Sequence, residues 1–197
     1  MEQNDRFRLQ RDNTICVIID LQTQLMSAMK HRIISEIEKN NGLLIASLKI
    51  LNVPIVVTEQ YPRGLGPTSD LIKQVLDDLY SPVEKVVFSC WNEPLFREKI
   101  SIYEPRNFIL TGIETHVCVL QTALDLLAEG NKVYIPADTT CSRYKSDWKN
   151  ALAMLDSAGA VITSVETVIF QLLEKAGTPE FKAISPLIKE RDKNNKL

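Results

Sequence analysis

The feature that most constrains the fold is an unbroken apolar run, Ile15 to Ile19, that stops abruptly at the acidic Asp20. A run without polar alternation is typical of a central parallel strand that is covered on both faces. Further β-rich runs follow, and we expect strands at 54–58, 85–88, 107–113, 132–137 and 160–163. Segments with helical spacing separate them, and we expect helices at 32–51, 70–79, 93–100, 117–127 and 148–158. This alternation predicts a three-layer α-β-α fold with a six-stranded, mainly parallel, Rossmann-like sheet.

The length of the chain favours one domain. Its 197 residues, of which 45% are hydrophobic, are enough to bury one core and few for two. We see no internal repeat and no linker-like segment, so we expect a single domain over residues 1–197 with its core at about 13–175. The charged and amide-rich segment 189–197 is expected to be frayed.

Charge and cysteine usage narrow the class of partner. The formal net charge of -2 gives no overall basic field for nucleic acid or an anionic membrane. No apolar run reaches the roughly 18 residues of a membrane span, and the polar, acidic start does not resemble a targeting signal. The four cysteines are widely spaced, without a Cys-x-x-Cys pair, which favours free thiols in a reducing compartment. We therefore expect a cytoplasmic protein that acts on a small molecule and binds neither nucleic acid nor membrane.

Three polar residues lie where open α/β sheets bind ligands, beyond the carboxyl ends of strands. Asp20 is either a helix N-cap or a partly desolvated general base. Cys118 is either a buried apolar cysteine or a nucleophile at a helix start, where amide N–H groups favour the thiolate and can hold an oxyanion. Lys85 is either a surface lysine paired with Glu84 or an inward ammonium that stabilises both other groups.

Histidine and metal chemistry fit the sequence poorly. His116 lies two residues from Cys118, and such positions face different directions on a helix, so a carboxylate base is needed. His31 is expected at the surface. The chain has no His-x-x-x-His, no paired Cys motif and no Asp-rich calcium loop. We therefore expect no metal and no cofactor.

Three motifs occur in order along the chain: VIIDLQ at 17–22, EKVVFS at 84–89 and TGIETHVCVLQTA at 111–123. In these motifs the chain, between residues 13 and 169, resembles the isochorismatase-like, or cysteine hydrolase, family, in the branch of isochorismatase-domain-containing proteins. The resemblance implies that Asp20, Lys85 and Cys118 form a catalytic triad. It also implies a cis peptide at Ile113–Glu114, an oxyanion hole made by the backbone N–H groups of Glu114 and Cys118, and a homo-oligomer, dimeric or larger.

Two departures from the family pattern narrow the expected reaction. The nicotinamidases of the family have an Asp and two His metal ligands after the second strand, where this chain reads Thr58-Glu59-Gln60-Tyr61-Pro62. True isochorismatases cleave a vinyl ether and lack the cysteine. Retention of Cys118 favours hydrolysis of an amide or carbamoyl C–N bond through a thioester. The alternatives are a vinyl ether hydrolase of isochorismate type and a non-catalytic binding or scaffolding member of the family.

The walls of the expected pocket are residues on or near the predicted loops, where an aromatic pair would suit a planar substrate. The alternative for each of them is ordinary packing. They are Gln22, Gln60, Tyr61, Phe88, Trp91 and Thr115.

Overall fold

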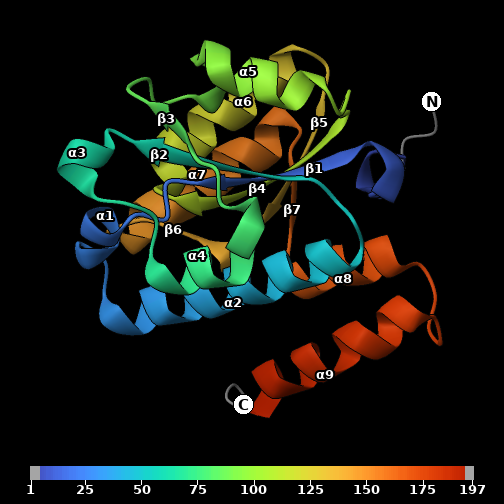
Figure 1. Ribbon diagram of the computed structural model, residues 1–197. Coiled ribbons are helices and arrows are strands. Elements are labelled where there is room, and N and C mark those ends of the chain that lie inside the picture. Colours follow the sequence, from blue (N-terminus) through green and yellow to red (C-terminus); the bar gives the residue numbers. More distant parts are fainter. Residues whose placement is uncertain (1–4, 194–197) are drawn as a thin grey trace.

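The computed structural model describes residues 5–193, and within them a parallel sheet lies between two layers of helices (Figure 1). The strands run in the order β3-β2-β1-β4-β5-β7, and the short β6 pairs with the end of β4. The strands are β1 (Thr14–Ile19), β2 (Ile55–Gln60), β3 (Val83–Lys85), β4 (Asn107–Ile113), β5 (Lys132–Pro136), β6 (Thr140–Cys141) and β7 (Val161–Thr163). The predicted three-layer parallel fold is confirmed.

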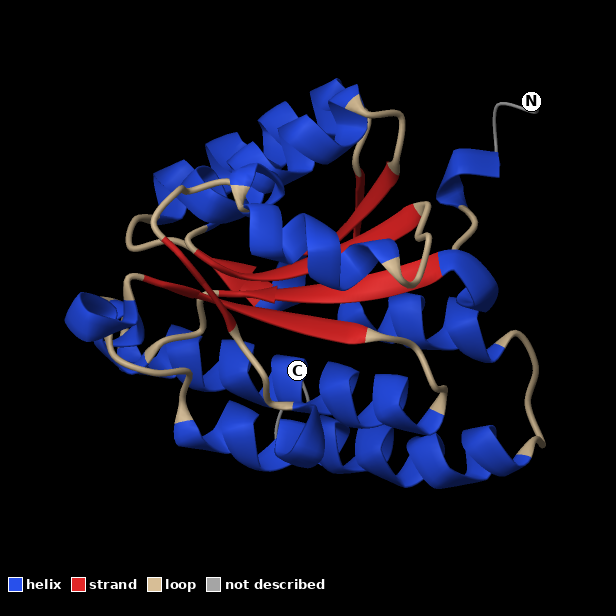
Figure 2. Cartoon of the chain, turned by 45° about the horizontal axis from the view of Figure 1, so that its top comes forward, coloured by secondary structure: helices blue, strands red, loops and turns tan. Residues whose placement is uncertain are grey.

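Helices cover both faces of the sheet, as the rotated view in Figure 2 shows. The layer on one face contains α5 (Pro94–Ser101), α6 (Leu120–Ala128) and α7 (Lys145–Ala158). The layer on the other contains α2 (His31–Ile50), α4 (Asp70–Leu76), α8 (Val165–Leu173) and α9 (Pro179–Lys193), with α9 packed on α2 and α8. Two short helices, α1 (Thr23–Ser27) and α3 (Pro62–Leu65), lie beyond the carboxyl ends of β1 and β2.

The strand β1 supplies both cores. Cys16 and Ile18 pack in the core beneath α2, whereas Ile15, Val17 and Ile19 pack in the core beneath α5, α6 and α7. Every residue of β1 is buried, which explains why its sequence lacks polar alternation. Burial of each large aliphatic side chain contributes about 1.5–3 kcal/mol.

Two sheet elements differ from the sequence-based expectation. The third strand was expected at 85–88 but ends at Lys85, because residues 86–88 leave the sheet and turn the Val87 and Phe88 carbonyls toward the Lys85 ammonium. The two-residue β6 was not expected. It follows β5 after a 3-10 turn, Ala137–Thr139, and is too short to show a hydrophobic period.

The helical ends also differ. The short helix α3 at 62–65, with Pro62 in its first turn, was not among the expected helices. Residues 189–193 of the expected frayed tail belong to α9, which is anchored by the buried Ile184 and Ile188, and residues 194–197 lie outside the described part of the chain. Within residues 5–193, no helix is both long and apolar enough to cross a bilayer.

Candidate active site

Asp20 follows β1 directly and is completely buried. Its Oδ1 accepts a hydrogen bond from Thr58 Oγ1 at 2.8 Å, and its Oδ2 lies 2.7 Å from Lys85 Nζ. The backbone of Asp20 is left-handed, with a φ of 51°. The carboxylate therefore lies inside the protein just beyond the central strand, between the Lys85 ammonium and the Thr58 hydroxyl.

Lys85 ends the edge strand β3 and points inward, and its side chain is inaccessible to solvent. Its Nζ donates to Asp20 Oδ2 at 2.7 Å, to Gln60 Oε1 at 2.8 Å and to the carbonyl of Phe88 at 3.2 Å. Burial is the largest single effect and lowers the pKa of Lys85, but the charges of Asp20, Cys90 and Cys118 and the hydrogen bond to Asp20 together outweigh it, so the net pKa is raised. Lys85 is therefore an ammonium throughout the physiological pH range.

Cys118 lies in a π-helical turn, Thr115–Val119, between β4 and α6. The turn follows a cis peptide, Ile113–Glu114, as the family resemblance implies. The first N–H groups of a helix have no partner among its own carbonyls, so amides here are suited to hold a negative oxygen. Within structures generally, single π-helical turns occur often at functional sites.

Cys118 is only 4% exposed, and its thiol lies against Asp20. Burial, the negative charge of Asp20 and a hydrogen bond to Asp20 raise the pKa of Cys118 far above its ordinary value, against the opposing effect of Lys85. The resting group is therefore a thiol paired with a carboxylate. The structure brings Asp20, Lys85 and Cys118 into one buried cluster.

Gly112 permits this approach of β4 to β1. It pairs with Ile19, and a Cβ at Gly112 would lie 1.9 Å from the Ile19 carbonyl oxygen. Its φ of 108° is also a conformation that side-chain-bearing residues rarely adopt. A glycine here lets the carboxyl ends of the two strands, which carry Asp20 and the cysteine turn, meet closely.

Gln22 and Gln60 form a reciprocal amide contact beyond the ends of β1 and β2. Gln22 Nε2 donates to the Gln60 carbonyl at 2.9 Å, and Gln60 N donates to Gln22 Oε1 at 2.7 Å. Gln22 Nε2 also donates to the Gly66 carbonyl. Both residues are buried, and Gln60 Oε1 contacts Lys85. The two side chains brace the site, whereas the sequence suggested that they line a pocket.

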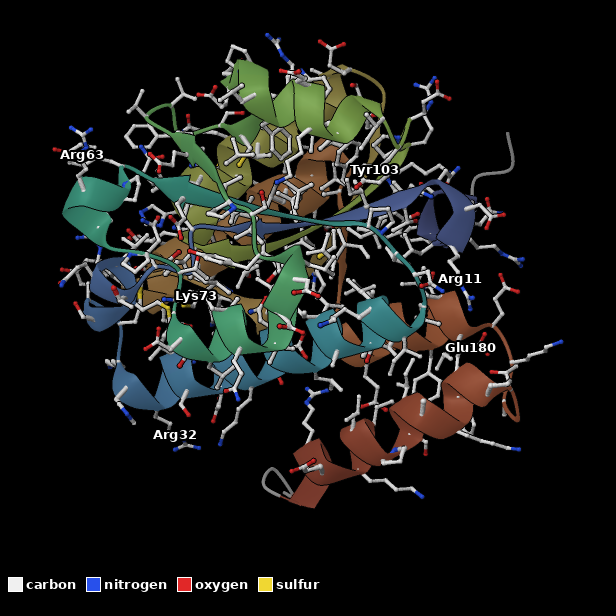
Figure 3. The ribbon with its side chains drawn as sticks, viewed as in Figure 1. Arg11, Arg32, Arg63, Lys73, Tyr103 and Glu180 are labelled. Atoms are coloured by element: carbon white, nitrogen blue, oxygen red, sulfur yellow. The ribbon has the colours of Figure 1, made fainter. Side chains whose placement is uncertain are left out.

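Two of the aromatic residues expected in the pocket, Tyr61 and Phe88, contact Lys85 through their backbones. Phe88 is 52% exposed and Tyr61 is 54% exposed, while Trp91 is half-buried beside Cys90. Thr115 is fully buried in the cysteine turn, and its hydroxyl has no hydrogen-bond partner in the described part of the chain. By contrast, the surface residues that Figure 3 labels, such as Arg63 on α3 and Arg32 on α2, extend away from the sheet.

Three contacts of the site were not anticipated from the sequence. Thr58 donates to Asp20, and the Cys90 thiol lies 3.8 Å from Thr58 Oγ1. The Glu114 side chain accepts from Arg143 N at 2.9 Å and pairs with the Arg143 guanidinium at 3.2 Å. The position of Thr58 at the end of the strand expected at 54–58 was a usable signal, whereas the distant Arg143 gave none.

In the described part of the chain, His116 and Glu59 have partners outside the cluster. His116 Nδ1 lies 2.9 Å from Ser142 Oγ, and its Nε2 lies 3.9 Å from Asp147 on α7. Glu59, in the segment where nicotinamidases would have a metal ligand, accepts hydrogen bonds from Thr68 and Tyr80. Among residues 5–193, no group of three or more His, Cys, Asp or Glu side chains is arranged to hold a metal.

Comparison with known proteins identifies the family. The family model of the isochorismatase domain matches residues 14–167. The secreted isochorismatase effector Isc1 of Phytophthora sojae is 39% identical over 186 residues, which cover 93% of this chain and 88% of the effector. Isochorismatase family protein 1A of Dictyostelium discoideum is 44% identical over 144 residues, which cover 72% of this chain and 70% of that protein.

A solved structure shows the same architecture. The structure of MAR1 ribonuclease from Caenorhabditis elegans is 36% identical, covers 92% of each chain and superposes with a TM-score of 0.85. The sequence relatives and this structural likeness agree with the parallel sheet and helical layers described above. The chain therefore belongs to the isochorismatase family and has the hydrolase fold of that family.

Proposed function

We propose that this protein hydrolyses an amide or carbamoyl C–N bond of a small molecule, with Cys118 as nucleophile, Asp20 as general acid–base and Lys85 as electrostatic partner. The observation that carries the proposal is the buried contact of the Cys118 thiol with Asp20, which is itself 2.7 Å from Lys85 Nζ. A thiol, a base and a fixed cation in one water-poor cluster are the components of nucleophilic acyl transfer.

The first half of the proposed reaction forms a thioester. Asp20 removes the Cys118 proton as the sulfur attacks the carbonyl carbon, and the carbonyl becomes a tetrahedral oxyanion. Backbone N–H groups of Glu114 and Cys118 hold that oxyanion. The protonated Asp20 then gives its proton to the leaving nitrogen, the C–N bond breaks, and the acyl group remains on Cys118.

The second half releases the acid. Asp20, again a carboxylate, takes a proton from water as the water oxygen attacks the thioester carbon. Collapse of the intermediate breaks the C–S bond and returns a proton to the sulfur. Lys85 remains an ammonium throughout, because its negative partners raise its pKa, and it stabilises the negative charge as it moves between Asp20 and Cys118.

Burial limits the size of the substrate. Cys118 is 4% exposed and Asp20 and Lys85 are almost inaccessible. We therefore propose that the reacting bond belongs to a small group, which enters past Tyr61 and Phe88. We propose that these aromatic residues contact a planar substrate, with Trp91 and Thr115 deeper in the same wall, and that Gln22 and Gln60 shape the site from within. The structural relative from Caenorhabditis elegans is named a ribonuclease, so a test of this proposal must include RNA as a substrate.

Ammonia release from a panel of primary amides and carbamoyl compounds tests the proposal. We expect release by the wild type that disappears in Cys118→Ala and persists in Cys141→Ala. Cys141 is also a buried free cysteine, but it packs in the core beneath α2, whereas Cys118 packs in the core on the other face. An RNA substrate and isochorismate complete the panel.

The other outcomes would overturn the proposal in different directions. Isochorismate turnover that survives Cys118→Ala would favour vinyl ether hydrolysis with Cys118 as a bystander. Cleavage of RNA that depends on Cys118 would favour a ribonuclease. No turnover, together with a Cys118 pKa near the ordinary value of about 8.5, would favour a non-catalytic binding or scaffolding role.

We also propose that the protein is a homo-oligomer and acts in the cytoplasm. Light scattering that gives the mass of one chain would remove the first proposal. Fractionation of cells would test the second, and the comparison is informative because the relative from Phytophthora sojae is a secreted effector.

A further inference from the structure

We propose that Thr122 is a positioning residue that fixes the cysteine turn relative to the loop that holds the Lys85 ammonium. Thr122 is fully buried on α6, one helical turn after Cys118. Its Oγ1 donates to the Cys118 carbonyl at 2.7 Å and accepts a hydrogen bond from Cys90 N at 2.9 Å. One hydroxyl thus joins two segments that are distant in the sequence.

These two hydrogen bonds close a ring of contacts around the reacting groups. The Cys90 segment begins with Phe88, whose carbonyl accepts from Lys85 Nζ at 3.2 Å. Lys85 Nζ contacts Asp20 Oδ2 at 2.7 Å, and Asp20 contacts the Cys118 thiol. The ring returns to Thr122 through the Cys118 carbonyl. Every connection around the ring is a hydrogen bond or lies within a short stretch of chain.

The hydroxyl group of Thr122, and not only its volume, contributes to this ring of contacts. A valine of similar shape would fill the same space but would leave the Cys118 carbonyl and the Cys90 N–H without their shared partner. The cysteine turn and the segment around Cys90 would keep their apolar packing and the exposed Asn92–Asp125 hydrogen bond, but they would lose the buried hydrogen bonds that join them beside the reacting groups. Errors of about 1 Å in the placement of reacting groups cost about 10²-fold in rate.

Alkylation of Cys118 by iodoacetamide, followed by mass spectrometry between pH 7 and pH 10, measures this placement without a substrate. Asp20 from the end of β1, Lys85 from β3 and Cys90 from the adjoining turn act on the thiol, whereas Asp147 of α7 faces His116. In Thr122→Val, we expect the cysteine turn to loosen, so that burial and Asp20 raise the pKa of the Cys118 thiol less than in the wild type. The rate of alkylation should then level off at a lower pH than in the wild type. Each unit of that fall in the pKa increases alkylation at pH 8 about tenfold.

Variants and a control separate positioning from packing. Thr122→Ser keeps the hydroxyl and should restore the wild-type profile, and Thr122→Ala serves if the valine variant does not fold. Thr139→Val is the matched control, because Thr139 is also fully buried and donates to a carbonyl, that of Pro136, at 2.7 Å. The control should lower the melting temperature and leave the Cys118 profile unchanged.

An activity measurement extends the test and rests on the proposed function. Thr122→Val should lower kcat about 10²-fold with little change in KM, and serine should restore it. A Thr122→Val protein with a wild-type alkylation profile and wild-type kcat would overturn this inference while leaving Cys118-dependent hydrolysis intact. If the wild type hydrolyses nothing, the proposed function is wrong, but the inference about Thr122 is still tested, because the alkylation profile needs no substrate.

Discussion

Asp20 adopts a left-handed backbone at the residue where its carboxylate meets Lys85 and Cys118. Alternation along β1 directs Cys16 and Ile18 toward α2, so a continued strand would direct Asp20 to that face also. Cys118, however, packs in the core on the opposite face. The φ of 51° redirects the carboxylate, at a conformational cost of about 1–3 kcal/mol. Such a cost at this residue is understandable if Asp20 has a chemical role.

Replacement of Asp20 by Asn should remove the base and keep the site assembled. The amide oxygen can still accept a hydrogen bond from Thr58 or Lys85, so near-ultraviolet circular dichroism should show a native fold. We expect kcat for amide hydrolysis to fall about 10²- to 10⁴-fold, the usual contribution of general acid–base catalysis. Asp138→Asn is the control, because Asp138 pairs with Arg191 away from the cluster. Full activity in Asp20→Asn would exclude Asp20 as the base.

The sequence predicted the ionisable residues of the site but not the residues that hydrogen-bond to them. Asp20, Lys85 and Cys118 were each found at a strand or helix boundary, and the structure places them together. The contact of Gln60 with Lys85 depends on the register of β2 against β3, in which these two residues are paired. Register between strands that are separated by a helix cannot be read from local pattern. Gln60 therefore looked like a pocket wall rather than a partner of the ammonium.

At the scale of elements, the junction of β1 and β4 holds the site together. Gly112 lies opposite Ile19, and its missing Cβ allows the two strands to carry Asp20 and the cysteine turn to the same point. A side chain at Gly112 would displace the Ile19 carbonyl from the sheet. Replacing Gly112 by alanine, which adds one methyl group, therefore tests whether β1 and β4 can move apart at this point.

Gly112→Ala should destabilise the protein much more than Gly159→Ala. Both glycines have a positive φ, 108° and 104°, so an alanine at either position is strained. A Cβ at Gly159 meets nothing within 4 Å, whereas one at Gly112 would overlap the Ile19 carbonyl oxygen. We expect a loss of about 1–3 kcal/mol for Gly159→Ala and several kcal/mol more for Gly112→Ala in urea unfolding. Equal losses would show that the strands separate easily at this point.

The elements that the sequence predicted well are those with a long hydrophobic period. The strand expected at 107–113 has those bounds in the structure, and the helix expected at 32–51 is α2, His31–Ile50. The strand expected at 85–88 is Val83–Lys85 in the structure. The β-branched Val86 and Val87 favour a strand by their propensity, but the Val87 and Phe88 carbonyls instead bind the Lys85 ammonium. Short helices such as α3 lack a period, so tertiary contacts decide them.

At the scale of the whole molecule, all four cysteines are buried free thiols with raised pKa values. Burial raises the pKa of Cys90 to about 11 and that of Cys141 to about 12. An unfolded thiol titrates near 8.5, so the unfolded chain loses these protons first as pH rises. The corresponding stability is complete below pH 8.5 and is lost between that pH and the folded pKa values.

The free energy of unfolding should therefore fall with pH above about 8.5, by up to about 1.4 kcal/mol per pH unit for each thiol. Urea unfolding at pH 8.0, 9.0 and 9.5 measures the slope. In Cys141→Ala, the free energy of unfolding should fall less steeply with pH than in the wild type, and the difference should equal the contribution of one thiol. A slope that is the same in both proteins would show that Cys141 titrates normally in the folded state.

The buried pairing of Asp20 with Lys85, beside a protonated Cys118, has a consequence for how a substrate reaches the protein. With the thiol protonated, the opposite charges of the two partners cancel, so the pair exerts little attraction at a distance. Capture of an uncharged amide would then be governed by diffusion and fit rather than by electrostatic steering, and would be insensitive to ionic strength. A cell could change its salt balance without changing how readily such a molecule is taken up by the site.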